Sequence, residues 1–84
     1  MYTIEWNKKA YKQLERIGNK YQQKIVVEVR KLSGWPNCKN VKTLKNHHYD
    51  HRVRVGNYRI FFNVENKVKI IRIEEVKKRD ERTY

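Results

Sequence analysis

Three arginines stand at alternating positions around a short turn signal: Arg52, Arg54 and Arg59, with Gly56-Asn57 between the second and the third. Gly-Asn is among the dipeptides that form two-residue turns between antiparallel strands. In such a hairpin Arg54 lies opposite Arg59, and directly opposed residues share a face of the sheet. Guanidinium groups gathered on one face repel each other, but their planar paired donors suit a phosphate group. The spacing therefore indicates an anion site.

The same register places Phe61 opposite Arg52, so its ring shares the arginine face. This ring is then either a stacking surface for a nucleobase, as aromatic rings are beside basic groups in proteins that bind single-stranded RNA, or simply a partly exposed aromatic residue of the sheet. The alternative is a solvated strand face whose arginines pair with Glu65 or Glu74.

The charge of the whole chain favours the anion site. Its 84 residues hold 21 lysines and arginines against 9 aspartates and glutamates, a formal net charge of +12. A field of this sign favours a polyanion as partner. Nucleic acid is the first candidate, because each neutralised phosphate releases counterions. An acidic protein is the second.

Periodicity predicts the elements that position the arginines. Residues 2–6 alternate as a strand, Asn7 is expected to cap a helix ending near Gly18, and a second helix spans residues 21–32. Four further strands are expected at residues 41–44, 51–55, 58–64 and 68–73. The remainder, 74–84, is expected to be a charged tail.

These elements predict a single α+β domain over residues 1–84. A first strand and a two-helix hairpin pack on one face of an antiparallel sheet of about four strands, which leaves the arginines on the open face. The longest aliphatic or aromatic runs are three residues, far below the roughly 20 of a membrane span. No membrane association is expected, and the cytoplasm is the expected compartment. Cys38 is the sole cysteine, and with the histidines it matches no usual zinc spacing, so neither metal nor cofactor is expected.

The stretch from Leu44-Lys45-Asn46 to Phe62, with its Arg-x-Arg-x-Gly-x-Tyr-Arg core, follows a two-helix start and precedes a basic tail ending in Tyr84. It resembles the RelE/ParE toxin superfamily of bacterial type II toxin-antitoxin systems, RelE-like branch. RelE-like members are ribosome-dependent endoribonucleases that cut mRNA in the decoding site and arrest translation. ParE-like members share the fold and poison DNA gyrase. The resemblance implies a cognate antitoxin, the ribosome with its 16S rRNA, and mRNA as partners.

By this resemblance Arg52 and Arg54 bind the RNA backbone, Arg59 steadies the scissile phosphate, and Arg79 with Tyr84 completes the site. The family pattern more often has lysines at the paired positions, and here the tail tyrosine is the last residue, at a slightly different spacing. The catalytic residues are predicted to be Arg54, Arg59, Arg79 and Tyr84. The RNA-binding residues are predicted to be Lys45, Arg52, Phe61, Lys77, Lys78 and Arg82.

Metal-independent cleavage by the RNA 2′-hydroxyl needs a base, stabilisation of the phosphorane and an acid for the leaving 5′-oxygen. Arginine suits stabilisation but, with a pKa above about 12, not proton transfer. Tyr84 is the favoured base, because surrounding arginines lower a phenol pKa. His47, His48 and His51 are alternatives with a suitable pKa of about 6.5, although strand alternation turns His51 away from the arginines. A gyrase poison and a non-catalytic nucleic-acid-binding module remain alternative functions.

Overall fold

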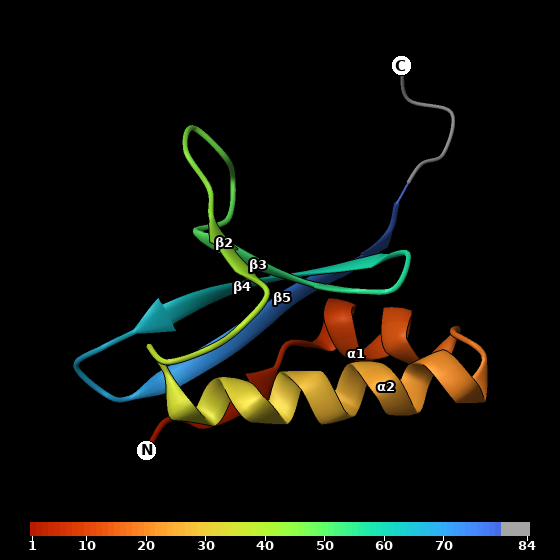
Figure 1. The fold of residues 1–84 in the computed structure, drawn as a ribbon, viewed down its shortest axis with the longest axis horizontal. Helices are drawn as coiled ribbons and strands as arrows, with labels where there is room; N and C mark the ends of the chain where they lie inside the picture. Colours follow the sequence, from red (N-terminus) through yellow and green to blue (C-terminus); the bar gives the residue numbers. More distant parts are fainter. Residues whose placement is uncertain (80–84) are drawn as a thin grey trace.

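The structure is a computed structural model that describes residues 1–79 (Figure 1). Its elements, in chain order, are β1 (Thr3–Trp6), α1 (Lys8–Glu15), α2 (Asn19–Arg30), the 3-10 helix η1 (Lys31–Gly34), β2 (Val41–Thr43), β3 (His51–Val55), β4 (Tyr58–Glu65) and β5 (Ile70–Lys78).

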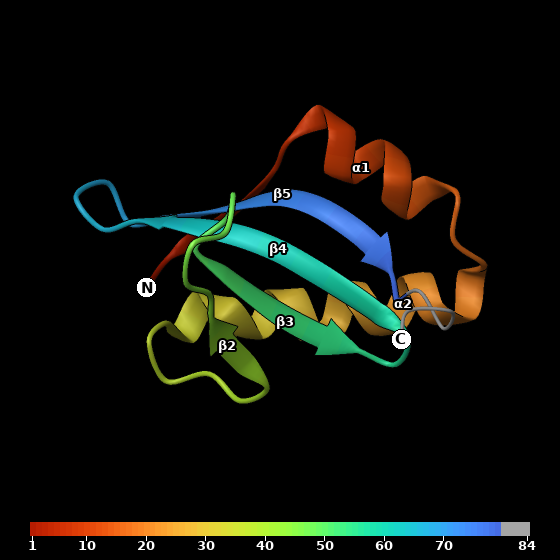
Figure 2. The ribbon, with the colours of Figure 1, turned by 90° about the horizontal axis from the view of Figure 1, so that it is seen from above.

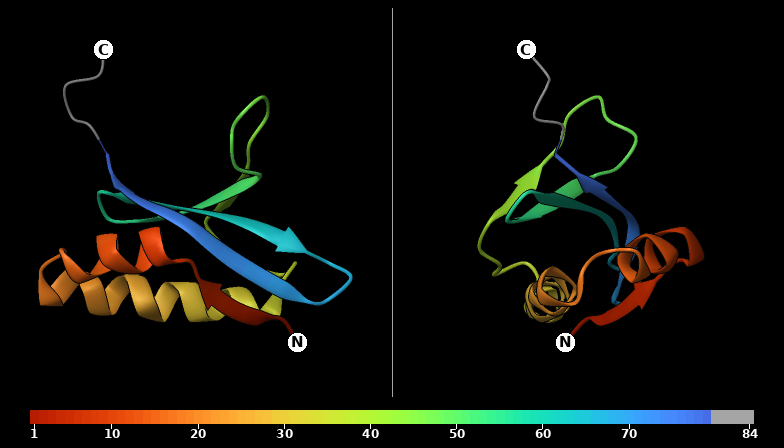
Figure 3. Two further views of the ribbon diagram at one scale, coloured as in Figure 1. Left: turned by 180° about the vertical axis from the view of Figure 1, so that it is seen from behind. Right: turned by 90° about the vertical axis from the view of Figure 1, so that its right-hand side faces the viewer.

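The strands form one five-stranded sheet in the order β1-β5-β4-β3-β2. Neighbouring strands run antiparallel except β1, which pairs in parallel with β5. Both helices lie on the same face of this sheet, and the loop between β2 and β3 rises from the other face (Figures 1 and 3). The expected α+β domain, with both helices on one face of the sheet, is confirmed. The first strand, expected to pack on that face, is instead the fifth strand of the sheet, and its parallel pairing with β5 makes the sheet mixed.

Asn7 begins α1 as predicted. Its side-chain Oδ1 accepts a hydrogen bond from the amide of Ala10 at 2.7 Å, which satisfies one of the amides that a helix N-terminus leaves unpaired. The helix then lies along β5 beyond the end of β1. There the amide of Val76 donates to Oε1 of Gln13 at 2.7 Å. The Gln13 side chain of α1 thus accepts a hydrogen bond from a backbone amide on the edge of β5, beyond the last residue that β1 pairs with.

The last strand is longer than predicted. β5 continues to Lys78, and one residue, Glu74, is inserted as a bulge between the pairs Phe62–Ile73 and Phe61–Glu75. Such a bulge reverses the alternation of the residues that follow it. The Glu74 carboxylate is held by Nδ2 of Asn7 at 2.8 Å and Nδ2 of Asn63 at 3.2 Å. The expected end of this strand at residue 73 is therefore wrong.

The core lies between the helices and the inner face of the sheet. Its largest fully buried side chains are Phe62, Ile25, Leu32, Ile60, Ile71, Ile73, Val29 and Val53. Trp35 closes one end of the core, with its ring centroid 5.6 Å from that of Phe62 and 4.7 Å from that of His51. His51 therefore lies on the helix side of the sheet, as its alternation predicts. No helix within residues 1–79 is long and apolar enough to cross a membrane.

Candidate nucleic-acid interface

The hairpin register is the one that the sequence predicts. Arg54 on β3 pairs with Arg59 on β4, and Arg59 pairs in turn with Lys77 on β5. Directly paired residues point to the same side, so these three cations form a row across three strands. Figure 2 looks onto this open face, with α2 behind the sheet.

A second row lies next to the first. Arg52 pairs with Phe61, Phe61 with Glu75, and on the outer side Lys42 of β2 pairs with Arg52. We call the cations of these two rows the arginine face. Its members are Lys42, Arg52, Arg54, Arg59 and Lys77.

The two carboxylates that the alternative pairs with these arginines are engaged elsewhere. Glu65 pairs with Arg72, and Glu74 accepts hydrogen bonds from two asparagines. Within residues 1–79, Arg52, Arg54 and Arg59 form no ion pair. Pairing with Glu65 or Glu74, the alternative considered for this face, does not occur.

The positive charges are close enough to affect one another. Burial, followed by the positive charges of Arg54, Arg59 and Arg79, lowers the pKa of the Arg52 guanidinium below its ordinary value. Arg79 reaches this cluster because its amide donates to the carbonyl of Asn57 at 2.6 Å. That bond ties the end of β5 to the hairpin turn. The structure therefore brings Arg79 to the arginine face, as the resemblance implies.

The Arg59 guanidinium includes a donor that the fold leaves unsatisfied. Its Nε atom is buried and has no hydrogen-bond partner within the described chain. Leaving a buried polar group without a partner costs about 1–3 kcal/mol. The buried Nε is out of reach of a ligand, but the flat guanidinium presents paired donors that suit two phosphate oxygens at once.

Phe61 is not the exposed ring that the sequence predicts. Only 5% of its surface is exposed, because the β2–β3 loop folds over it. The His47 ring stacks on it with centroids 5.2 Å apart and an interplanar angle of 14°, and the Tyr49 ring lies 5.5 Å away. The expectation of a partly exposed Phe61 is wrong, and the ring presented to solvent at this point is that of His47, which is itself exposed.

Tyr49 and Glu75 are two polar groups of this face that sequence reasoning missed. The Tyr49 hydroxyl donates to Oε1 of Glu75 at 3.0 Å, and Nζ of Lys9 lies 3.6 Å from the same oxygen. Burial, the hydrogen bond to Glu75 and nearby negative charge raise the pKa of Tyr49, so the phenol stays neutral. The one signal in the sequence for this contact was the aromatic residue Tyr49 inside a segment expected to be a turn.

The remaining predicted residues are distributed unevenly. Lys45 is exposed in the loop that rises from the open face (Figure 1). Lys78 pairs with Tyr58, which packs against the core, so Lys78 lies on the side opposite the arginines. Arg82 and Tyr84 lie outside the described residues. Within residues 1–79 no group of three or more His, Cys, Asp or Glu side chains is placed to hold a metal ion.

Comparisons with known proteins identify the family. A family model described as ParE toxin of type II toxin-antitoxin system, parDE, matches residues 4–83. A search of curated proteins finds no significant match. Among solved structures, the chain is similar to one in the archaeal RelE-RelB complex from Pyrococcus horikoshii, with 25% identity, a TM-score of 0.80, and 95% of this chain and 97% of that one covered.

Two further structures share the fold at lower identity. The isolated E. coli RelE toxin is 13% identical with a TM-score of 0.82, and 96% of this chain and 87% of that chain are covered. A chain of the RelBE2 complex from Mycobacterium tuberculosis is 21% identical with a TM-score of 0.79, covering 93% of this chain and 98% of that one. Because the family model spans nearly all of the sequence, the chain belongs to the ParE toxin family of type II toxin-antitoxin systems, within the RelE/ParE superfamily.

Proposed function

We propose that this toxin is a ribosome-dependent endoribonuclease that cleaves mRNA in the decoding site and so arrests translation. The observation that carries the proposal is the arginine face, where Arg52, Arg54 and Arg59 form no ion pair within residues 1–79 and Nε of Arg59 is buried without a partner. Such a face is costly to the folded chain and is suited to a phosphodiester group.

The reaction proposed is attack of the RNA 2′-hydroxyl on the adjacent phosphorus, which forms a 2′,3′-cyclic phosphate and releases the 5′-oxygen as a free hydroxyl protonated by water. Arg59 and Arg54 stabilise the negative charge that grows on the phosphorane oxygens, and Arg79 contributes from the end of β5. Arg52 binds the neighbouring backbone. Tyr84 is proposed as the base that accepts the 2′-hydroxyl proton, a role carried by the family resemblance. No metal or other cofactor takes part.

A cognate antitoxin is proposed as the second partner. The Mycobacterium tuberculosis neighbour was crystallised as a toxin-antitoxin complex, and the Pyrococcus horikoshii neighbour as a RelE-RelB complex. A chain of net charge +12 is best neutralised by an acidic segment that folds along its surface. Co-expression of the cognate antitoxin should restore growth. Growth inhibition that no such protein relieves would contradict this part of the proposal.

The proposed activity is tested by inducing the toxin briefly and following translation and DNA integrity in the same cells. Translation should stop at once, with cleaved mRNA and intact chromosomes, because the proposed target is the cytoplasmic ribosome. Purified toxin should cut mRNA on a programmed ribosome. DNA breaks that precede any loss of translation would overturn the proposal.

The second candidate function is a DNA gyrase poison. It is favoured by the family model, whose description names ParE. The same experiment separates the two, because gyrase poisoning gives DNA damage first. Addition of purified toxin to gyrase and supercoiled plasmid provides a direct second measurement.

A further inference from the structure

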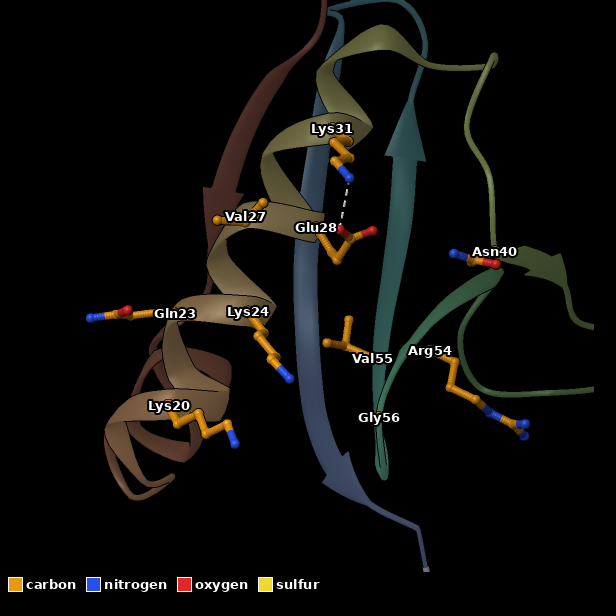
Figure 4. A pocket seen from close by; sticks show the side chains of 10 residues that line it. All are labelled: Lys20, Gln23, Lys24, Val27, Glu28, Lys31, Asn40, Arg54, Val55 and Gly56. Carbon is orange, nitrogen blue, oxygen red and sulfur yellow. Dashed lines mark hydrogen bonds and ion pairs between the residues drawn. The ribbon is translucent and has the colours of Figure 1, made fainter.

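A second basic surface lies between α2 and β3, around the sheet edge from the arginine face. It is a cleft of about 700 Å³. Four basic side chains line it against one carboxylate, that of Glu28. The basic residues are Lys20, Lys24, Lys31 and Arg54. In Figure 4, Lys20 and Lys24 extend from α2 toward the hairpin, and Arg54 leaves β3 on the side away from the helix.

The positive charge of this cleft is poorly compensated. Glu28 is engaged by Lys31 at 2.8 Å, whereas Lys20, Lys24 and Arg54 form no ion pair within residues 1–79. Lys20 also lies in the first turn of α2, which contains no acidic residue and has no side-chain cap. A cation is unfavourable at a helix N-terminus. This placement costs stability and favours an anion nearby.

The helix and the hairpin approach each other closely beside the cleft. Gly56, at φ 57°, lies so close to Tyr21 that a Cβ there would come within 3.1 Å of Cε1 of that ring. Nζ of Lys24 in turn lies 5.3 Å from the centre of the Tyr21 ring, a cation–π distance. The close approach of Gly56 to Tyr21 sets the distance between α2 and the hairpin at this point. The cation–π contact gives the Lys24 side chain a preferred direction.

The cleft continues into the arginine face. A second cleft of about 440 Å³ is lined by Lys42, Arg52 and Arg54 on that face. Asn40, Arg54 and Gly56 line both clefts. β2 pairs with β3 no further than Val53, so the edge of β3 at Arg54 has no neighbouring strand. A chain of phosphates on the arginine face can pass this open edge toward Lys24.

We propose that the groove between α2 and β3 binds the phosphodiester backbone of the RNA strand whose scissile phosphate lies on the arginine face. The inference rests on the proposed function, and it extends the RNA contact from the scissile phosphate to several consecutive phosphates of the same strand. Lys20 and Lys24 hold the flanking backbone, and Arg54 lies where the two clefts meet. An acidic polypeptide is the competing occupant, and the test separates the two.

The test compares the double variant Lys20→Ala/Lys24→Ala with the control Lys12→Ala/Lys67→Ala, which removes the same charge from exposed lysines outside both clefts. Binding of oligouridylates of about 4 and about 16 nucleotides is measured against salt. We expect the groove variant to lose affinity for the long oligomer, with a salt slope smaller by about 1.4, since each single-strand phosphate contributes about 0.7. The short oligomer should bind the two double variants equally.

Equal slopes for the two double variants on the long oligomer would overturn the inference. So would a groove variant that loses binding to polyglutamate but not to RNA, since the groove would then bind a polypeptide. Both double variants must be fully folded at every salt concentration used, because removing Lys20 from the N-terminus of α2 is itself expected to change stability. Binding is measured without cleavage, so the outcomes are separable: length-dependent binding with no ribosomal cleavage would refute only the proposed enzyme, and cleavage without the groove effect would refute only the groove.

Discussion

Arg54 and Arg59 face each other across the β3–β4 hairpin as direct cross-strand partners. Like charges at directly opposed positions destabilise a hairpin, and no carboxylate within the described chain offsets them. The pair therefore lowers the stability of the free protein. This cost is consistent with a site organised for a phosphate that is bound only during function.

Replacing Arg54 or Arg59 with Ala should lower the cleavage activity without lowering the stability of the protein. Single-turnover cleavage on a programmed ribosome should fall about 10²–10³-fold, the usual cost of removing one preorganised donor from a transition-state anion. The free energy of unfolding in urea should not fall, because a like-charge contact is removed. Arg30→Ala on α2 is the control. Near wild-type cleavage by both variants would exclude the arginine pair from the reaction.

Tyr84→Phe should greatly lower the rate of the cleavage step and leave the affinity for the ribosome nearly unchanged, because only the hydroxyl of the proposed base is removed. His47→Gln combined with His48→Gln should cleave almost normally. If the histidine variant instead loses activity together with a pH inflection near neutrality, imidazole is the proton carrier. Full activity in Tyr84→Phe would rule out the tail tyrosine.

Tyr49→Phe should destabilise the protein by about 0.5–1.5 kcal/mol, the usual value of one hydrogen bond. The pKa of Tyr49 is raised in the folded state, so its contribution is full below the unfolded pKa of about 10 and is lost as pH rises through the folded pKa. Urea unfolding across this range should show the wild type approaching the variant. A difference that does not narrow at high pH would contradict the assignment.

His51 should make the protein acid-sensitive. Burial lowers its pKa, and Asp50 opposes this only in part. The unfolded chain then binds more protons, so stability is full above about pH 6.5 and is lost as pH falls through the folded pKa. His51→Gln should flatten this dependence in urea unfolding, whereas the exposed His47→Gln should not. Equal pH profiles for wild type and His51→Gln would refute the prediction.

The β3–β4 hairpin could be predicted almost residue by residue, and the last strand could not. A two-residue turn joined to strict alternation leaves one register that buries Val53 and Ile60 together. At Glu74 the inserted residue breaks the alternation, so the charged residues that follow resemble a tail. Nothing in the local pattern marks the bulge, because its carboxylate is satisfied by asparagines distant in the sequence.

The site shows the same limit. Cross-strand neighbours such as Arg54 and Arg59 follow from the register, so the shared face was predictable. The cover over Phe61 was not, because it depends on where the β2–β3 loop returns, and an irregular segment has no periodicity to read. That loop is positioned by long-range bonds, such as the one from the Asp50 amide to Oδ1 of Asn63 at 2.8 Å.

The parallel pairing of β1 with β5 also governs when the toxin can form during its own synthesis. β5 lies between β1 and β4 in the sheet, yet it is the last of the described strands to be made. Until β5 leaves the ribosome, β1 has no partner, α1 has no strand edge to cover, and the row from Arg54 to Lys77 is incomplete. A ribosome translating this message therefore carries a toxin whose sheet is incomplete until β5, which ends at Lys78, has been made. An antitoxin that is synthesised before β5 is complete is therefore already present when the toxin's sheet forms.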